Sequence, residues 1–212
     1  MSRLFASLLV LVLSGCANHP PPPDWLLTAG SAIDAHARYW LEGRDTLAAG
    51  QLEQARAAVA RTGDASQMAR VELHACAIRL ASLQGGECPA FAVLAGDAGE
   101  GERAYAAYLA GRLGETDIAK LPTAQQQAWR QPSSLAGIAD PLPRLVAAAA
   151  LLEAGRLPPA GIALAIDTAA GQGWRRPLLA WLRLEQARLQ GLGDTGGADA
   201  VARRIERVLR ER

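Results

Sequence analysis

The sequence has few of the residues that build β-strands. Aromatic side chains make up 5% of its 212 residues, and β-branched residues form almost no runs. Strand-like alternation is hard to find anywhere along the chain, whereas alanine and leucine, both strong helix formers, dominate it. We therefore predict an all-α protein made of antiparallel helical hairpins.

A surplus of either charge is also missing. The chain carries 22 basic and 21 acidic side chains, and Lys120 is its single lysine. A balanced charge provides no electrostatic attraction toward nucleic acid, and we expect no nucleic-acid partner.

The patterns of common active sites are absent as well. The sequence contains no G-x-S-x-G, P-loop or H-E-x-x-H motif, and no G-x-G-x-x-G follows a strand. His74 and Cys76 stand two positions apart on an expected helix and so point to different faces, which makes them a poor pair of metal ligands. We expect a protein that is not an enzyme and has no metal or cofactor; an enzyme whose site assembles only in three dimensions is the alternative.

No apolar run is long enough to span a bilayer. The apolar residues 4–13 follow Arg3 and number about ten, whereas a spanning helix needs roughly 20. A basic start, a short apolar core and then small residues are typical of a secretory signal. The run ends in Leu13-Ser14-Gly15-Cys16, which resembles the lipobox of bacterial lipoproteins.

That resemblance implies a signal peptide over residues 1–15 and diacylation of Cys16, so that the membrane is reached through a lipid anchor. Residues 16–24 would follow as a spacer, because the HPPPP tract favours an extended, semi-rigid chain. In lipoproteins of this type an aspartate after the cysteine favours the inner membrane, and Ala17 in that place favours the periplasmic face of the outer membrane. The alternative is an ordinary signal peptide with an incidental cysteine.

Acylation of Cys16 would leave two cysteines, Cys76 and Cys88. In an oxidising periplasm such an isolated pair predicts a disulfide. The bridge requires the loop after the first cysteine to fold straight back along its helix, because the Cα atoms must come within about 7 Å.

A four-residue pattern, Ala-Gly-x-Leu, recurs along the chain with its glycines at positions 50, 111 and 155. Each copy follows an expected amphipathic helix, so each glycine is expected to end a helix. The first of these helices runs from residue 25 to residue 49, with Gly30 and Gly43 as the places where it could bend or split. Such helix–glycine–helix units resemble tetratricopeptide repeats, with Gly43 and Ala55 on the small positions around Gly50. The spacing of the glycines is irregular, so the domain over residues 25–211 is either a degenerate repeat array or an irregular helical bundle, with a possible joint between two halves near residues 114–140.

Two further segments stand out. The expected helix after Asp140 is apolar on nearly every side and should be buried at the centre of the C-terminal half. Tryptophan and arginine gather at the entrance of a later helix as Trp174, Arg175, Arg176 and Trp181. These residue types are common both at binding hot spots and in internal stacking, so the cluster is a possible interaction site or a packing element.

Together these features predict a lipid-anchored periplasmic lipoprotein whose helical domain is a non-catalytic binding or scaffold module for a protein of the cell envelope. The alternatives are an enzyme or enzyme activator that acts on the cell wall, and a structural lipoprotein without a specific partner.

Overall fold

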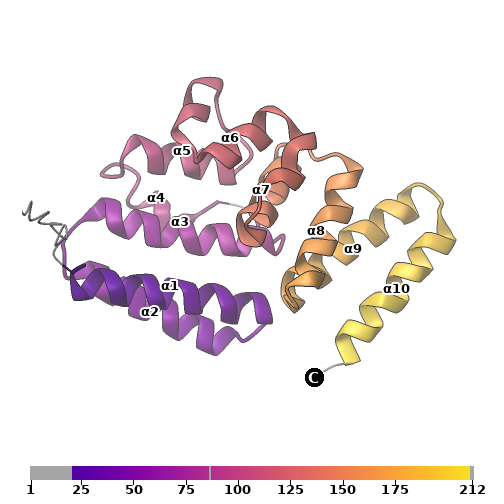
Figure 1. Ribbon diagram of the computed structural model, residues 1–212, viewed down its shortest axis with the longest axis horizontal. Coiled ribbons are helices and arrows are strands. Elements are labelled where there is room, and N and C mark those ends of the chain that lie inside the picture. Colours follow the sequence, from indigo (N-terminus) through magenta and orange to yellow (C-terminus); the bar gives the residue numbers. More distant parts are fainter. Residues whose placement is uncertain (1–20, 86, 211–212) are drawn as a thin grey trace, which may run out of the picture.

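The computed structural model describes residues 21–85 and 87–210. In this part of the chain every regular element is a helix, which confirms the predicted all-α class (Figure 1). The α-helices are α1 (Asp24–Glu42), α2 (Asp45–Ala60), α3 (Ala65–Ala81), α4 (Pro89–Ala92), α5 (Glu100–Leu109), α6 (Thr123–Arg130), α7 (Pro141–Glu153), α8 (Pro159–Gly171), α9 (Arg175–Gly191) and α10 (Thr195–Arg210). Two 3-10 helices, η1 (Glu115–Lys120) and η2 (Pro132–Gly137), flank α6. The predicted signal peptide and Cys16 lie outside the described residues.

Helices α1 and α2 form an N-terminal hairpin whose turn differs from the prediction. Helix α1 ends before Gly43, which adopts the left-handed conformation with φ +87°. The N–H groups of Gly43 and Arg44 donate to the carbonyls of Trp40 and Tyr39, a glycine-dependent pattern that ends many helices. The helix expected over residues 25–49 is therefore split at Gly43, one of the two places expected for a break. The prediction that Gly50 ends a helix is wrong, because Gly50 lies inside α2.

Packing explains why α2 continues through Gly50. Ala48 and Ala55, on either side of this glycine, are fully buried. His36 of α1 lies with its Nδ1 atom 2.8 Å from the carbonyl oxygen of Ala48. These contacts between the helices offset the loss of about 1 kcal/mol that a glycine causes inside a helix.

Helix α3 packs against the hairpin on one side and against α5 and α7 on the other. The side chain of Asp64 caps the N-terminus of α3 and accepts hydrogen bonds from the N–H groups of Ser66 and Gln67. Beyond the end of α3 the chain turns back, and Cys76 and Cys88 lie at disulfide distance with their Cα atoms 6.0 Å apart. The predicted proximity of the two cysteines is confirmed.

Helix α7 is the centre of the largest hydrophobic cluster, which draws side chains from α3 to α10. The helix begins as predicted: Asp140 accepts a hydrogen bond from the N–H of Leu142, and Pro141 occupies its first position. All residues from 145 to 151 are buried, which confirms the prediction of a helix enclosed on every side. Helices α3, α5, α6 and α8 surround it.

Two of the three Ala-Gly-x-Leu glycines do end helices. Gly111 and Gly155 have φ values of +68° and +66° and follow α5 and α7, respectively. Between them, residues 114–140 form η1, α6 and η2, which pack against α5 and α7. The resemblance to tetratricopeptide repeats and the division into two halves stay predictions.

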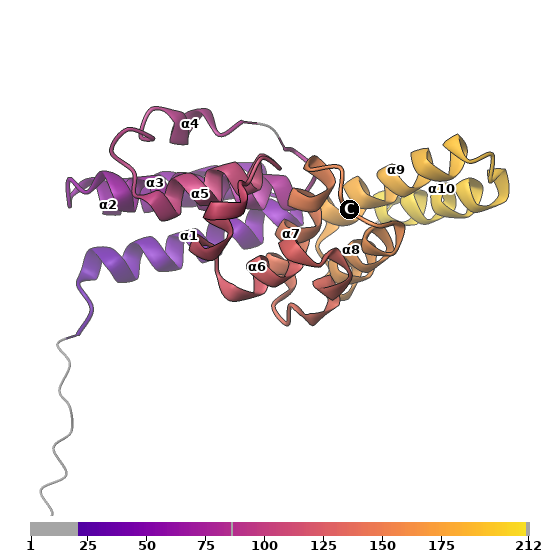
Figure 2. The ribbon, with the colours of Figure 1, turned by 90° about the horizontal axis from the view of Figure 1, so that it is seen from above.

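Helices α8, α9 and α10 continue the array toward the other end of the molecule (Figures 1 and 2). Helix α10 packs against α9, with Ala198 and Ile205 buried, and three of its arginines, Arg203, Arg207 and Arg210, are exposed. In Figure 2 the α9–α10 hairpin projects from the body, so the start of α1 and the turn between α9 and α10 lie at opposite ends.

Candidate functional site

The predicted cluster at the start of α9 is occupied by contacts within the chain. The guanidinium of Arg176 lies 4.2 Å from the centre of the Trp40 ring, and its Nε donates to the carbonyl of Trp40 at 2.7 Å. The same guanidinium forms an ion pair with Asp45. Arg176 therefore joins α9 to both helices of the N-terminal hairpin.

The other members of this cluster face elsewhere. Arg175 donates to the carbonyl of Val208 at 3.3 Å, near the C-terminal end of α10, where a cation is favourable. Trp181 is fully buried and donates from Nε1 to the carbonyl of Ala81 at 3.0 Å. Trp174 is half-buried and packs on the central cluster. The four side chains thus make separate internal contacts, and their role in binding a partner stays a prediction.

A second region combines a hollow with convergent polar groups. Between α3, α5 and the end of η1 lies a hollow of about 330 Å³, a size suited to a small ligand or a single protruding side chain. The residues that line it include Arg70, Leu73, His74, Glu102, Tyr105 and Lys120. We refer to this region as the α3–α5 hollow.

An ion pair closes one wall of the hollow. The Nε atom of Arg70 donates to Oε1 of Glu102 at 2.7 Å, which links α3 to α5. The guanidinium of Arg70 lowers the pKa of the Glu102 carboxyl, which is buried beside it. Glu102 is therefore ionised at neutral pH, and it is not the protonated acid that a cell-wall hydrolase would require.

Two uncharged hydrogen-bonding groups face the hollow from the same helices. Burial lowers the pKa of His74 to about 4, so its imidazole is neutral at pH 7. Burial also raises the pKa of the Tyr105 hydroxyl to about 12, which keeps it protonated. The Nε2 atom of His74 is buried and has no hydrogen-bond partner among the described residues. This nitrogen is enclosed by the protein, so it is not itself open to the hollow.

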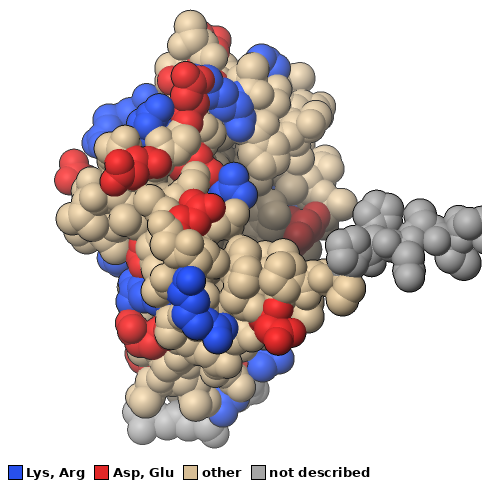
Figure 3. Space-filling view, turned by 90° about the vertical axis from the view of Figure 1, so that its left-hand side faces the viewer, with Lys and Arg blue, Asp and Glu red and all other residues tan. Residues whose placement is uncertain are grey.

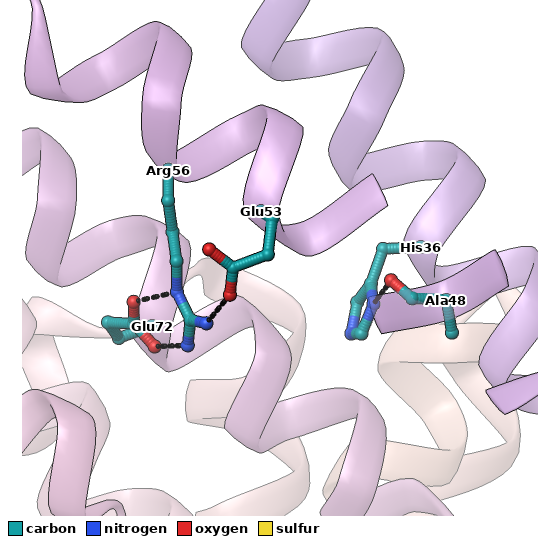
Figure 4. Close-up of polar contacts among 5 residues, drawn as sticks. All are labelled: His36, Ala48, Glu53, Arg56 and Glu72. Atoms are coloured by element: carbon teal, nitrogen blue, oxygen red, sulfur yellow. Dashed lines mark hydrogen bonds and ion pairs between the residues drawn. The ribbon is translucent and has the colours of Figure 1, made fainter. Parts of the chain in front are cut away.

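The N-terminal hairpin contains another polar cluster, which Figure 4 shows. Arg56 of α2 forms two hydrogen bonds, of 2.6 and 2.7 Å, with the carboxylate of Glu72 on α3. A third bond of 2.6 Å joins Arg56 to Glu53, and these carboxylates raise the pKa of the guanidinium. Glu72 is buried and Arg56 is partly exposed, and their contact joins α2 to α3.

The residues of the α3–α5 hollow were missed as a group by sequence reasoning. The sequence does indicate which residues share a helix face. Arg70 and His74 are four residues apart on α3, and Glu102 and Tyr105 are three residues apart on α5. Only the fold shows that these two faces meet.

No family model, curated protein or solved structure matches the chain. Within residues 21–85 and 87–210, no group of three or more histidine, cysteine, aspartate or glutamate side chains is placed to hold a metal ion. None of the helices in the same ranges combines the length and the apolar character needed to cross a membrane.

Proposed function

We propose that the protein is a lipid-anchored periplasmic lipoprotein whose helical domain binds a protein of the cell envelope at the outer membrane. The observation that carries the proposal is the stretch Leu13-Ser14-Gly15-Cys16 at the end of a short apolar run. The proximity of Cys76 and Cys88 supports it, because paired cysteines are typical of oxidising compartments such as the periplasm.

The binding surface in this proposal is the α3–α5 hollow. Its ion pair and the protonated Tyr105 hydroxyl suit hydrogen bonding to a protruding side chain of a partner. Its walls are helices fixed by the central core, so the hollow is formed before a partner arrives, which reduces the entropy lost on binding.

Replacement of Cys16 tests the anchor. Cells that express the wild-type protein should incorporate labelled fatty acid into it, and the processed form should be recovered in the membrane fraction. The variant Cys16→Ala should accumulate as an unlabelled precursor. Fatty-acid labelling that persists in the variant would contradict the anchor at Cys16.

A photo-crosslinking amino acid tests the binding surface. Placed at Lys120, on the rim of the hollow, it should yield a covalent adduct with an envelope protein in intact cells. The matched control carries the same group at Val93, which is 83% exposed and lies outside the hollow. The additional substitution Tyr105→Ala should reduce the adduct formed from Lys120. Equal adducts at both positions, or none at either, would reject the hollow as the binding surface.

A further inference from the structure

The first turn of α1 exposes apolar side chains to solvent. Leu26 and Leu27 are 45% and 57% exposed, and they directly follow the half-buried Trp25. Trp25 packs against the small cluster between α1, α2 and α3, which holds the turn in place. We refer to these three residues as the Trp25–Leu27 patch.

The patch lies close to Cys16 along the chain. Nine peptide steps separate Cys16 from Trp25, and nine residues can span at most about 30 Å. The start of α1 is also at one end of the molecule, opposite the turn between α9 and α10 (Figures 1 and 2). A tether of this length keeps the patch nearer to the bilayer than most of the described surface.

The charges around the patch favour no particular lipid. Asp24 precedes it, while Arg61 and Asp64 lie at the same end of the hairpin, between α2 and α3. Figure 3 looks onto this end of the molecule, where basic and acidic side chains are interspersed and neither sign forms a continuous patch. Attraction to anionic headgroups is therefore weak, and the apolar side chains must provide the interaction.

We propose that the Trp25–Leu27 patch rests in the interfacial region of the membrane to which Cys16 is anchored, and so orients the domain. Leucine gains free energy when it leaves water, and tryptophan favours the boundary between headgroups and acyl chains. Two leucines alone would bind a membrane weakly, but a tether of nine residues makes the contact intramolecular. The α9–α10 hairpin would then point away from the membrane. This inference rests on the proposed lipid anchor and adds a second contact to it.

The test uses the acylated full-length mature protein in phosphatidylcholine vesicles whose acyl chains carry bromine, a quencher of tryptophan fluorescence. The expected result is quenching that disappears in Trp25→Phe, because Trp25 is the reporter at the patch. The double variant Leu26→Ser/Leu27→Ser should lose most of the quenching. The control Leu192→Ser, which changes a leucine that is 70% exposed at the far end of the molecule, should keep it.

The results of this experiment distinguish a failure of the membrane contact from a failure of the lipid anchor. Acylated protein that floats with the vesicles without quenching, or whose quenching is unchanged in Trp25→Phe or in the leucine double variant, would overturn the membrane contact alone. Protein that carries no acyl chain would overturn both the anchor and the contact. Quenching should also be insensitive to added salt, and a loss of quenching at high salt would contradict an apolar contact.

Discussion

The α1–α2 hairpin lies at the edge of the helical array whereas helix α7 is enclosed by its neighbours, and different side chains form their interfaces (Figure 1). Buried alanines dominate between α1 and α2, including Ala29, Ala32 and Ala55. Helix α7 also buries alanines, at positions 147–150, but around them lie Leu145, Leu151 and larger aliphatic side chains from the surrounding helices. The hairpin interfaces also contain buried polar groups, since His36 is buried on α1 and Glu72 is buried on α3, where it meets Arg56 of α2.

This difference indicates two ways of specifying helix packing. Small residues let α1 and α2 approach closely but remove little apolar area from water. Directional contacts, such as Arg56 with Glu72, then define how the hairpin aligns with α3. Around α7 the large apolar area provides stability by itself. Substitutions in the two regions should therefore differ in their effect on stability.

Truncation of a leucine in α7 should have the largest effect. Leu151→Ala removes a fully buried side chain and leaves a cavity, so we expect the free energy of unfolding to fall by about 3 kcal/mol. Urea unfolding followed by circular dichroism measures it. Leu192→Ala, at an exposed leucine, should change the value by less than about 0.5 kcal/mol. Similar losses for both variants would show that α7 is not the stabilising centre.

Gly111 lies close to the end of α7, and we expect its replacement by alanine to have the next largest effect on stability. A Cβ atom at Gly111 would lie 2.6 Å from the backbone nitrogen of Ala154, whereas a Cβ atom at Gly155 would meet nothing within 4 Å. Both glycines have positive φ, so Gly155→Ala should cost about 1 kcal/mol from backbone strain alone. Gly111→Ala should cost at least about 1 kcal/mol more, because backbone atoms must shift. Equal melting temperatures for the two variants would refute the tight contact.

Removal of Glu72 tests the polar contact of the hairpin. Glu72→Ala leaves the guanidinium of Arg56 without its buried partner, and we expect a loss of about 2 kcal/mol, reduced from that of a fully buried pair because Arg56 is partly exposed. The double variant Arg56→Met/Glu72→Leu should regain most of that stability, since apolar side chains replace both charges. A double variant as unstable as Glu72→Ala would indicate that the ion pair itself stabilises the hairpin.

We expect a smaller change in the free energy of unfolding from protonation of the buried histidines. Burial lowers the pKa of both His36 and His74, the latter to about 4. The unfolded chain therefore binds more protons than the folded one below about pH 6.5, and stability falls as the pH decreases toward 4. Between pH 7 and 5 we expect a loss on the order of 1 kcal/mol from His74. His74→Gln should reduce this slope in urea titrations at several pH values, and an unchanged slope would assign the effect to other groups.

The features that sequence reasoning predicted correctly depend on local chemistry. The all-α class follows from alanine and leucine content, the start of α7 from Asp140 and Pro141, and the burial of α7 from its apolar residues on every side. Each of these signals lies within one segment.

The errors arose where neighbours in space decide. Gly43 and Gly50 both stand among helix-forming residues, and either could end a helix by propensity alone. The burial of Ala48 and Ala55 and the contact of His36 with the Ala48 carbonyl favour a helix through Gly50. The α3–α5 hollow was missed for the same reason, because no local signal indicates that the faces of α3 and α5 meet.

The chemical state of the mature N-terminus decides whether the protein is anchored by lipid. Mass spectrometry of the protein extracted from membranes should identify an N-terminal peptide that begins at Cys16 and carries at least two acyl chains. A mature protein that begins at another residue, or a Cys16 without acyl chains, would contradict the lipid anchor on which the proposed function rests.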